Sequence, residues 1–159
     1  MKTRDWLALA GWLFVSFSAA IIGGTATASS VATWYPTIAK PAWTPPSWLF
    51  GPVWTTLYAM MGFAAWLVWR KAGWRDGAVP LGLFLTQLVL NAAWSLLFFG
   101  LRNPFAGLID IAALWIAIGL TTVAFFRISR IAGWLMIPYW LWVSFATALN
   151  FAIWQLNRV

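Results

Sequence analysis

Five long apolar stretches, separated by short connections that hold most of the charges, dominate this sequence of 159 residues. Each is about 20 residues long, which at about 1.5 Å per residue lets a helix cross a hydrocarbon core of about 30 Å. The stretches run over residues 6–28, 46–69, 79–100, 104–126 and 132–155. Because 63% of the chain is apolar and only 8% is charged, its composition is far from that of soluble domains. The sequence predicts an all-α membrane protein, a single domain over residues 1–159 formed by a five transmembrane helix bundle.

The first apolar stretch has two interpretations. Its basic start, its apolar run and the small residues "ATA" at 26–28 are typical of a secretory signal with a cleavage site. However, the run is longer than the roughly 7 to 15 residues of a signal core, and Asp5 weakens the basic start. Ser16, Ala20 and Gly24 also form a ladder of small residues at four-residue spacing, which suits close helix contact in a membrane. We therefore interpret the stretch as the first membrane helix.

The basic residues indicate how the chain is oriented. If it crosses the membrane five times, seven lysines and arginines lie on the side of the N-terminus: Lys2, Arg4, Arg70, Lys71, Arg75, Arg127 and Arg130. The other side holds three: Lys40, Arg102 and Arg158. The positive-inside rule then predicts a multi-pass protein of a bacterial membrane with a cytoplasmic N-terminus. Nucleic acid is not an expected partner, since the basic residues are split among short loops rather than gathered on one face.

The residue types that are missing exclude several kinds of catalysis. The chain has no histidine, cysteine or glutamate, which excludes thiolate and imidazole catalysis, zinc sites and paired-carboxylate hydrolysis. We expect neither a metal nor a required cofactor. Asp110 is the only acid within a predicted span, and such groups are functional candidates because they cost roughly 2.5 to 3.5 kcal/mol at mid-membrane. Because no second relay partner accompanies it, we favour a structural role, hydrogen-bonded near the helix end or paired with Arg102.

Three of the predicted helices carry aromatic and polar residues at helical spacing. In the stretch 79–100, Gln87, Asn91 and Trp94 share one face. The stripes of the other two helices are Trp54, Tyr58 and Met61, and Tyr139, Trp142, Ala146 and Asn150. Apolar surfaces with a few convergent polar groups are typical of ligand pockets. They are equally typical of helix contacts in membranes, where Asn and Gln hydrogen-bond across the bundle, and spacing alone does not separate the two interpretations.

The connection between the first two helices, "WYPTIAKPAWTPPSW" at 34–48, concentrates proline and tryptophan. Prolines at 41, 45 and 46 block a continuous helix and favour extended residues before them. Thr44 followed by Pro45 is typical of a helix N-cap, so the second helix is expected to begin there. Because the segment is too aromatic for a free loop, we interpret it as a rigid Pro/Trp-rich flap over the mouth of the bundle. A flap in this position favours the interpretation of the three stripes as the walls of a ligand pocket.

Four segments of the chain carry a resemblance to a known family. They are "WYPTIAKPAWTPPSWLFGPVWTTLY" (34–58), "QLVLNAAWSLLFFG" (87–100), "NPFAGLIDIAALW" (103–115) and "IPYWLWVSFATALNFAIWQLN" (137–157). Together they resemble the TspO or tryptophan-rich sensory proteins, relatives of the mitochondrial translocator protein and peripheral-type benzodiazepine receptor. The resemblance implies a five-helix bundle, commonly a homodimer, with a pocket under the first loop. It also implies binding of porphyrins such as protoporphyrin IX and of isoquinoline carboxamide drugs.

The resemblance also implies particular contacts. Carried over by position, the ligand contacts of the family match Tyr35, Trp43, Trp54, Asn91, Trp142 and Ala146. The spacing argument adds Trp94 and leaves Gln87 and Tyr139 as further candidates. Asp110 matches an acid in family members. The cholesterol motif of the mitochondrial branch needs a tyrosine and a downstream arginine where this chain has Phe151 and Gln155, which argues against cholesterol as a partner.

Three classes of function follow from these observations. The first is a membrane sensor or regulator that binds a tetrapyrrole. The second is a light-dependent porphyrin-degrading enzyme, in which the porphyrin is the photosensitiser and Trp54 or Trp142 takes part in the photochemistry. The third is a transporter of porphyrin or lipid, which is less favoured because neither inverted repeats nor helices broken near the midplane are visible. Gly82 with Thr86, and the ladder of the first helix, are weak signals for the homodimer.

Overall fold

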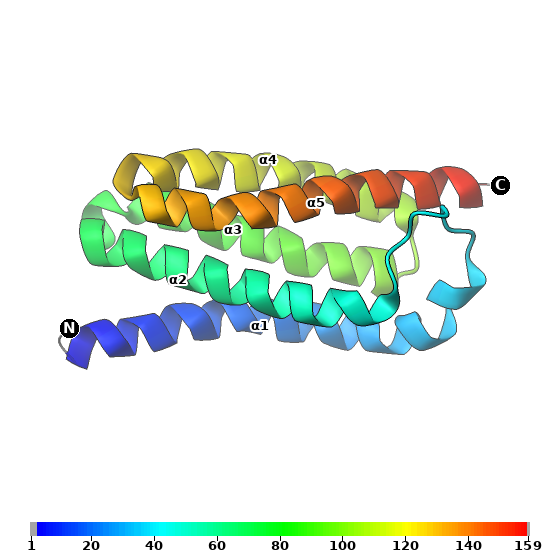
Figure 1. Ribbon diagram of the computed structural model, residues 1–159, viewed down its shortest axis with the longest axis horizontal. Helices are drawn as coiled ribbons and strands as arrows, with labels where there is room; N and C mark the ends of the chain where they lie inside the picture. Colours follow the sequence, from blue (N-terminus) through cyan, green and yellow to red (C-terminus); the bar gives the residue numbers. More distant parts are fainter. Residues whose placement is uncertain (1–2, 159) are drawn as a thin grey trace.

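The computed structural model describes residues 3–158 and confirms the all-helical architecture (Figure 1). Its five long helices are α1 (Thr3–Thr33), α2 (Phe50–Asp76), α3 (Ala78–Ser95), α4 (Pro104–Ile128) and α5 (Arg130–Asn157). Two single 3-10 turns, η1 (Tyr35–Thr37) and η2 (Ser47–Leu49), lie between α1 and α2, and a π-helical segment, η3 (Leu96–Gly100), extends α3. No strand occurs within residues 3–158.

The five helices form a closed ring. Contacts join them in the order α1, α2, α5, α4, α3 and back to α1, and α2 also contacts α3 and α4 across the ring. Consecutive helices run antiparallel, as their short connections require (Figure 1). The connection between α1 and α2 lies at the same end of the bundle as the C-terminus of α5. We call this the loop end.

Four of the described helices are long and apolar enough to cross a bilayer: α1, α3 together with η3, α4 and α5. The fifth, α2, has the length, but its tryptophan, tyrosine and threonine residues lower its hydropathy. It nevertheless lies alongside the others, and eight of its residues are buried between them. The bundle therefore contains all five helices that the sequence predicts.

The start of α2 corrects the prediction from the sequence. Thr44 is not an N-cap, because its hydroxyl donates instead to the carbonyl oxygen of Pro41 at 2.7 Å. Pro46 holds an extended backbone, with φ −61° and ψ 141°, and one 3-10 turn separates it from the helix that begins at Phe50. At the other end α2 reaches Asp76, beyond the apolar stretch, but Gly73, with φ 67° and ψ −162°, kinks it before its last residues.

Small residues bring α1 close to its neighbours, in a register that differs from the predicted ladder. Ser16, Ala19 and Gly23 are buried, and the Ser16 hydroxyl donates to a main-chain carbonyl of α2 at 2.8 Å. A Cβ on Gly23 would lie 2.8 Å from the Ser95 Oγ of α3, so a larger residue there would require the Ser95 side chain to move. The predicted contact is confirmed for Ser16, and Ala20 packs against the core while only partly buried. Ala20 and Gly24 lie one position further round the helix and line the cavity described below.

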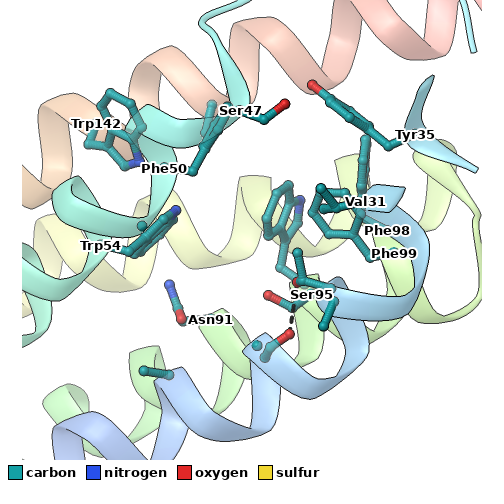
Figure 2. A pocket seen from close by; sticks show the side chains of 18 of the residues that line it. Val31, Tyr35, Ser47, Phe50, Trp54, Asn91, Ser95, Phe98, Phe99 and Trp142 are labelled. Carbon is teal, nitrogen blue, oxygen red and sulfur yellow. Dashed lines mark hydrogen bonds between the residues drawn. The ribbon is translucent and has the colours of Figure 1, made fainter. Parts of the chain in front are cut away.

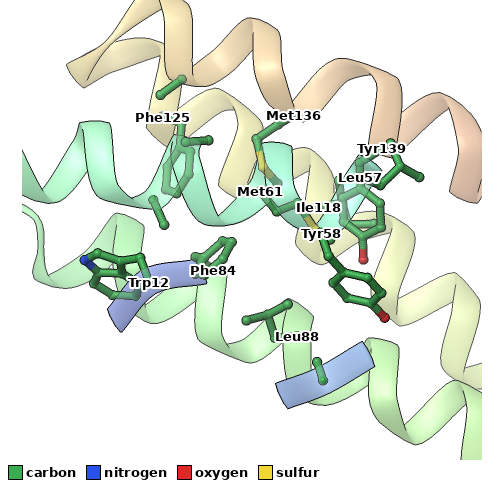
Figure 3. Close-up of a cluster of buried hydrophobic side chains, with 14 of the residues drawn as sticks. Trp12, Leu57, Tyr58, Met61, Phe84, Leu88, Ile118, Phe125, Met136 and Tyr139 are labelled. Carbon is green, nitrogen blue, oxygen red and sulfur yellow. The ribbon is translucent and has the colours of Figure 1, made fainter. Parts of the chain in front are cut away.

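The half of the bundle away from the loop end is filled by closely packed side chains, and we call it the solid half (Figure 3). Phe84 and Phe125 stack with ring centroids 5.9 Å apart, and Trp12 meets Phe84 edge-on at 5.9 Å. Met61 and Met136 are fully buried among them. Close packing of this kind is the main source of helix association in a membrane, where burial from water no longer contributes. This half therefore holds the ring together and leaves the loop end to form a site.

Candidate ligand-binding site

A cavity of about 500 Å³ occupies the loop end of the bundle, between α1, α2, α3 and α5 (Figure 2). Its walls are predominantly apolar, with a few hydroxyl, amide and indole groups among them. A cavity of this size and lining is typical of a small-molecule site.

One wall of the cavity is a run of aromatic rings from α2 and α5. Trp54 lies against Tyr58 with centroids 5.5 Å apart. Trp142 meets Phe50 edge-on at 6.0 Å and contacts Phe145 at 5.6 Å. Figure 2 shows Trp54 on one side of the space and Phe98, from η3, on another. Flat aromatic faces on more than one side suit a planar, unsaturated ligand.

The opposite wall is built on Trp94 of α3. Its ring stacks on Phe98 with centroids 5.2 Å apart, and its indole Nε1 donates to Asn150 Oδ1 at 2.9 Å. The Asn150 amide in turn donates to the carbonyl oxygen of Pro104 at 2.8 Å. Because the indole N–H is already used within the protein, Trp94 offers a ligand its ring face rather than a hydrogen bond.

A chain of hydrogen bonds fixes the floor of the cavity. The Tyr58 hydroxyl donates to Asn91 Oδ1, and Asn91 Nδ2 donates to the Tyr139 hydroxyl at 3.1 Å. The Tyr139 hydroxyl donates to Gln87 Oε1 at 2.8 Å, and Gln87 Nε2 points to the Met61 sulfur at 3.9 Å. We call these residues the buried polar chain. Two members of the chain, Tyr58 and Asn91, line the cavity. The Asn91 side-chain amide still has one N–H and one acceptor site that these hydrogen bonds do not use.

The mouth of the cavity lies under η1 and η2. Tyr35 is buried, and its hydroxyl and the side chain of Ser47 point toward one another across the opening (Figure 2). Burial raises the pKa of the Tyr35 phenol above its usual value of 10.0, so this group stays neutral and able to donate at physiological pH. Lys40 Nζ donates to the carbonyl oxygens of Tyr35 and Ile38 at 2.7 and 2.9 Å and lies 4.9 Å from the Tyr35 ring centroid.

Two further hydrogen bonds attach this segment to the end of α5. The backbone N–H of Ala39 donates to Asn157 Oδ1 at 3.0 Å, and Asn157 Nδ2 donates to the Ala39 carbonyl oxygen at 2.8 Å. Asn157 Nδ2 also lies 2.7 Å from the carbonyl oxygen of Ile153, one turn earlier. We call this pair of contacts the Asn157 clasp. It joins residues 118 positions apart and holds the α1–α2 connection over the bundle.

Six of the nine site residues predicted from the sequence line this cavity: Tyr35, Trp54, Asn91, Trp94, Trp142 and Ala146. Three others do not. Trp43 is half exposed and lies edge-on to Phe145 at 5.7 Å. Gln87 and Tyr139 are fully buried behind the floor, within the buried polar chain. The helical spacing identified the correct faces, but it did not show where along each helix the cavity ends.

The sequence analysis missed the wall that α1 contributes. This wall includes Gly24, Ala28, Val31 and Ala32. Glycine and alanine carry no polar or aromatic signal, so a stripe that contacts a neighbour and a stripe that borders a cavity look the same in the sequence. The missed η3 residue Phe99 lies within an apolar run, where no periodic pattern distinguishes it.

Asp110 is not among the residues that line the cavity. Its Oδ2 atom is buried and has no hydrogen-bond partner among the described residues. The predicted structural role through a contact with Arg102 is therefore not observed for this oxygen.

Comparison with known proteins agrees with this geometry. A family model described as the TspO/MBR family matches residues 12–155. The chain belongs to this family. The match includes α2, α3 and α4, most of α1 and α5, and every cavity residue named from the sequence. Like the family, the chain is an integral multi-pass membrane protein.

Relatives in this family come from distant organisms. The tryptophan-rich protein TspO of Archaeoglobus fulgidus is 52% identical over 135 residues, which cover 85% of this chain and 87% of the relative. The protein of the same name from Chlorobaculum tepidum is 48% identical over 97% of this chain and 98% of its own length. The human translocator protein is 38% identical, covering 96% of this chain and 92% of the relative.

Proposed function

We propose that this TspO-family protein is a membrane sensor or regulator that binds a tetrapyrrole, such as protoporphyrin IX, within the bundle. The observation that carries the proposal is the cavity of about 500 Å³ with aromatic rings from α2, α3 and α5 on several sides. The same space suits the flat, fused rings of isoquinoline carboxamide drugs. The lining residues include no acid, lysine or arginine, so binding without chemistry is the simplest function for the site.

In this proposal the tetrapyrrole lies with its rings against Trp54 and Trp142, in contacts worth about 0.5 to 1.5 kcal/mol each beyond burial. Ala146 on α5 keeps the adjoining wall open. The polar edge of the macrocycle points to the mouth, where the side chains of Tyr35 and Ser47 point toward one another. Asn91 positions the Tyr58 ring through the buried polar chain and keeps one N–H for the ligand.

The connection between α1 and α2 acts in this proposal as a flap over the bound ligand. Its hydrogen bonds to Asn157 and those of Lys40 to its own carbonyls support this role, since they fix the segment on the bundle. We further propose that the loop end faces away from the cytoplasm, as the distribution of basic residues indicates. A homodimer, the usual state that the family resemblance implies, is part of the proposal.

The experiment that tests this function is a dark titration of the purified protein with protoporphyrin IX, read by tryptophan quenching. We expect saturable binding that Trp142→Ala weakens about two- to tenfold, because one ring contact is lost. Trp134→Ala is the matched control, since Trp134 lies two turns earlier on α5, is exposed and does not line the cavity. Quenching that does not saturate, or equal effects of both substitutions, would refute the proposal.

A light-dependent porphyrin-degrading enzyme is the second candidate. The observation that favours it is that Trp54 and Trp142, both able to react with an excited porphyrin, border one space. Repeating the titration under illumination separates the candidates, because only the enzyme produces new absorbance bands that depend on Trp142. Vectorial uptake of porphyrin into sealed vesicles would instead support a transporter.

A further inference from the structure

The cavity is open sideways between α1 and α2. On α1, Gly24, Ala28 and Ala32 follow one another at four-residue spacing, and each is both exposed and part of the cavity wall. On α2, Gly51 and Thr55 have the same two properties. A Cβ on Gly24 or Gly51 would meet no other atom within 4 Å. We call the opening between these residues the α1–α2 portal.

The portal arises because α1 and α2 touch at one end and separate toward the other. In the solid half, a Cβ on Gly62 would lie 3.0 Å from the Leu13 Cα, so the two backbones are in direct contact. At Gly24 and Gly51, near the loop end, the backbones of α1 and α2 are no longer in contact, because a Cβ there would meet no other atom within 4 Å. Since α1 is long and apolar enough to span the membrane, we expect its exposed residues Gly24 and Ala28 to face the hydrocarbon of the bilayer. The cavity therefore connects with the interior of the membrane.

Such a cavity will not stay empty, and water is a poor occupant. A buried water needs two to four polar partners, whereas the walls are predominantly apolar and several of their polar groups already bond within the protein. The Tyr58 hydroxyl is used by Asn91, the Trp94 indole by Asn150, and the Thr27 hydroxyl bonds to its own helix. Hydrocarbon chains need no such partners and are present at high concentration outside the portal.

We propose that an acyl chain of a membrane lipid enters through the α1–α2 portal and occupies the cavity when no other ligand is bound. The dimensions agree: the wall on α5 runs from Trp142 to Ile153, about 17 Å at about 1.5 Å per residue, and one leaflet contributes about half of the 30 Å core. The lipid headgroup remains at the mouth, beside Ser47 and Tyr35. The inference concerns the cavity of the proposed function but does not depend on tetrapyrrole binding.

The test is photocrosslinking in vesicles of phosphatidylcholine that carries a diazirine near the middle of one acyl chain, because Leu149 and Ile153 lie in the part of the cavity nearer the mouth. Leu149 and Ile153 line the cavity and are buried, while Leu141 and Leu156 on the same helix are exposed to lipid. After irradiation and proteolysis, we expect mass spectrometry to find lipid adducts on both kinds of residue. Adducts confined to Leu141 and Leu156 would overturn the proposed occupant.

A matched pair of variants tests the route. Gly24→Leu places a side chain in the portal, whereas Gly11→Leu changes an exposed glycine on the same helix that has equally open surroundings and lies outside the cavity wall. We expect Gly24→Leu to reduce adducts on Leu149 at least fivefold relative to those on Leu141. Gly11→Leu should leave this ratio unchanged. Cavity adducts that persist in Gly24→Leu would overturn the portal.

Two further measures keep the result interpretable. Gly51→Leu closes the portal from α2 and replaces Gly24→Leu if that variant fails to show the helical circular dichroism of the wild type. Porphyrin is absent throughout, so the crosslinking result stands whether or not the dark titration detects tetrapyrrole binding. Conversely, a failure to crosslink the cavity leaves the titration unaffected.

Discussion

At the scale of single residues, the buried polar chain shows how polar groups are kept within an apolar bundle. Tyr58, Asn91, Tyr139 and Gln87 come from three helices, and each donor that the chain uses meets an acceptor. The Tyr139 hydroxyl is the central member, since it accepts from Asn91 and donates to Gln87. In a medium without water, an unsatisfied group in this position is expensive, so the chain holds its side chains in one arrangement.

Replacing Tyr139 by phenylalanine should therefore destabilise the protein. The change leaves an Asn91 N–H and the Gln87 oxygen unpaired, and we expect the free energy of unfolding in detergent micelles to fall by about 1 to 3 kcal/mol. Tyr35→Phe is the control, because the Tyr35 hydroxyl makes no hydrogen bond to another described residue. If both variants unfold at the same denaturant concentration, the buried polar chain does not stabilise the bundle.

The sequence predicted which residues face the interior of the bundle, but it did not predict which of them line the cavity and which are buried behind it. Gln87, Asn91 and Trp94 were correctly placed on one face by their spacing, because the period of a helix fixes direction around its axis. The period says nothing about height along the axis. Met61 and its neighbours fill the space beside Gln87, whereas the space beside Trp94 is open, and only the packing of all helices decides this difference.

At the scale of elements, the connection between α1 and α2 is held in place by ring contacts and by few hydrogen bonds. Its two 3-10 turns leave most of its backbone without regular hydrogen bonds, and the Asn157 clasp supplies its hydrogen-bonded link to α5. Segments of this kind open at a lower free energy than the helices they connect. The clasp is therefore expected to govern how often the mouth of the cavity opens.

Removing the clasp should loosen the connection without unfolding the bundle. For Asn157→Ala we expect the amides of residues 34–46 to exchange with deuterium roughly tenfold faster or more, since two hydrogen bonds contribute about 1 kcal/mol each. Gln155→Ala is the matched control, because Gln155 is exposed in the same last turn of α5. Unchanged exchange in Asn157→Ala, or equal acceleration in both variants, would show that the clasp does not hold the segment.

The starts of some elements follow from local chemistry, and others do not. Asn103 before Pro104 caps α4, its side chain accepting from the Ala106 N–H at 3.0 Å, in the manner typical of its residue type. Thr44 before Pro45 has a similar local pattern but no helix follows. The second proline and the packing of the segment on α5 decide the outcome there, and neither is visible in a window of four residues.

At the scale of the whole molecule, one half of the ring is solid and the other encloses the cavity. The number of helices and their antiparallel order follow from five apolar stretches with short connections. The ring order does not, because apolar residues surround each helix and leave no single face to assign to a neighbour. For the same reason the wall from α1 could not be predicted, although three of the four walls were.

A ligand that fills the cavity should raise the thermal stability of the whole bundle. At a free concentration 100 times Kd, protoporphyrin IX would add about 2.7 kcal/mol if it binds only the folded state, which corresponds to an increase in Tm of roughly 5 to 10 °C. The measurement is far-UV circular dichroism on heating in the dark. Ala146→Leu, which fills part of the cavity, should show a smaller increase at the same concentration. Identical increases in both proteins would place the ligand outside the cavity.

The solid half has a consequence for how such a protein can diverge. Because Phe84, Phe125 and Met136 pack far from the cavity, substitutions at the loop end change the shape of the binding space without weakening the packing that holds the ring. A lineage can therefore explore new ligands by a few changes on Ala146, Gly24 or Val31 while it keeps the same scaffold. Selection for folding and selection for ligand choice then act mainly on separate halves of the bundle, which meet at the buried polar chain.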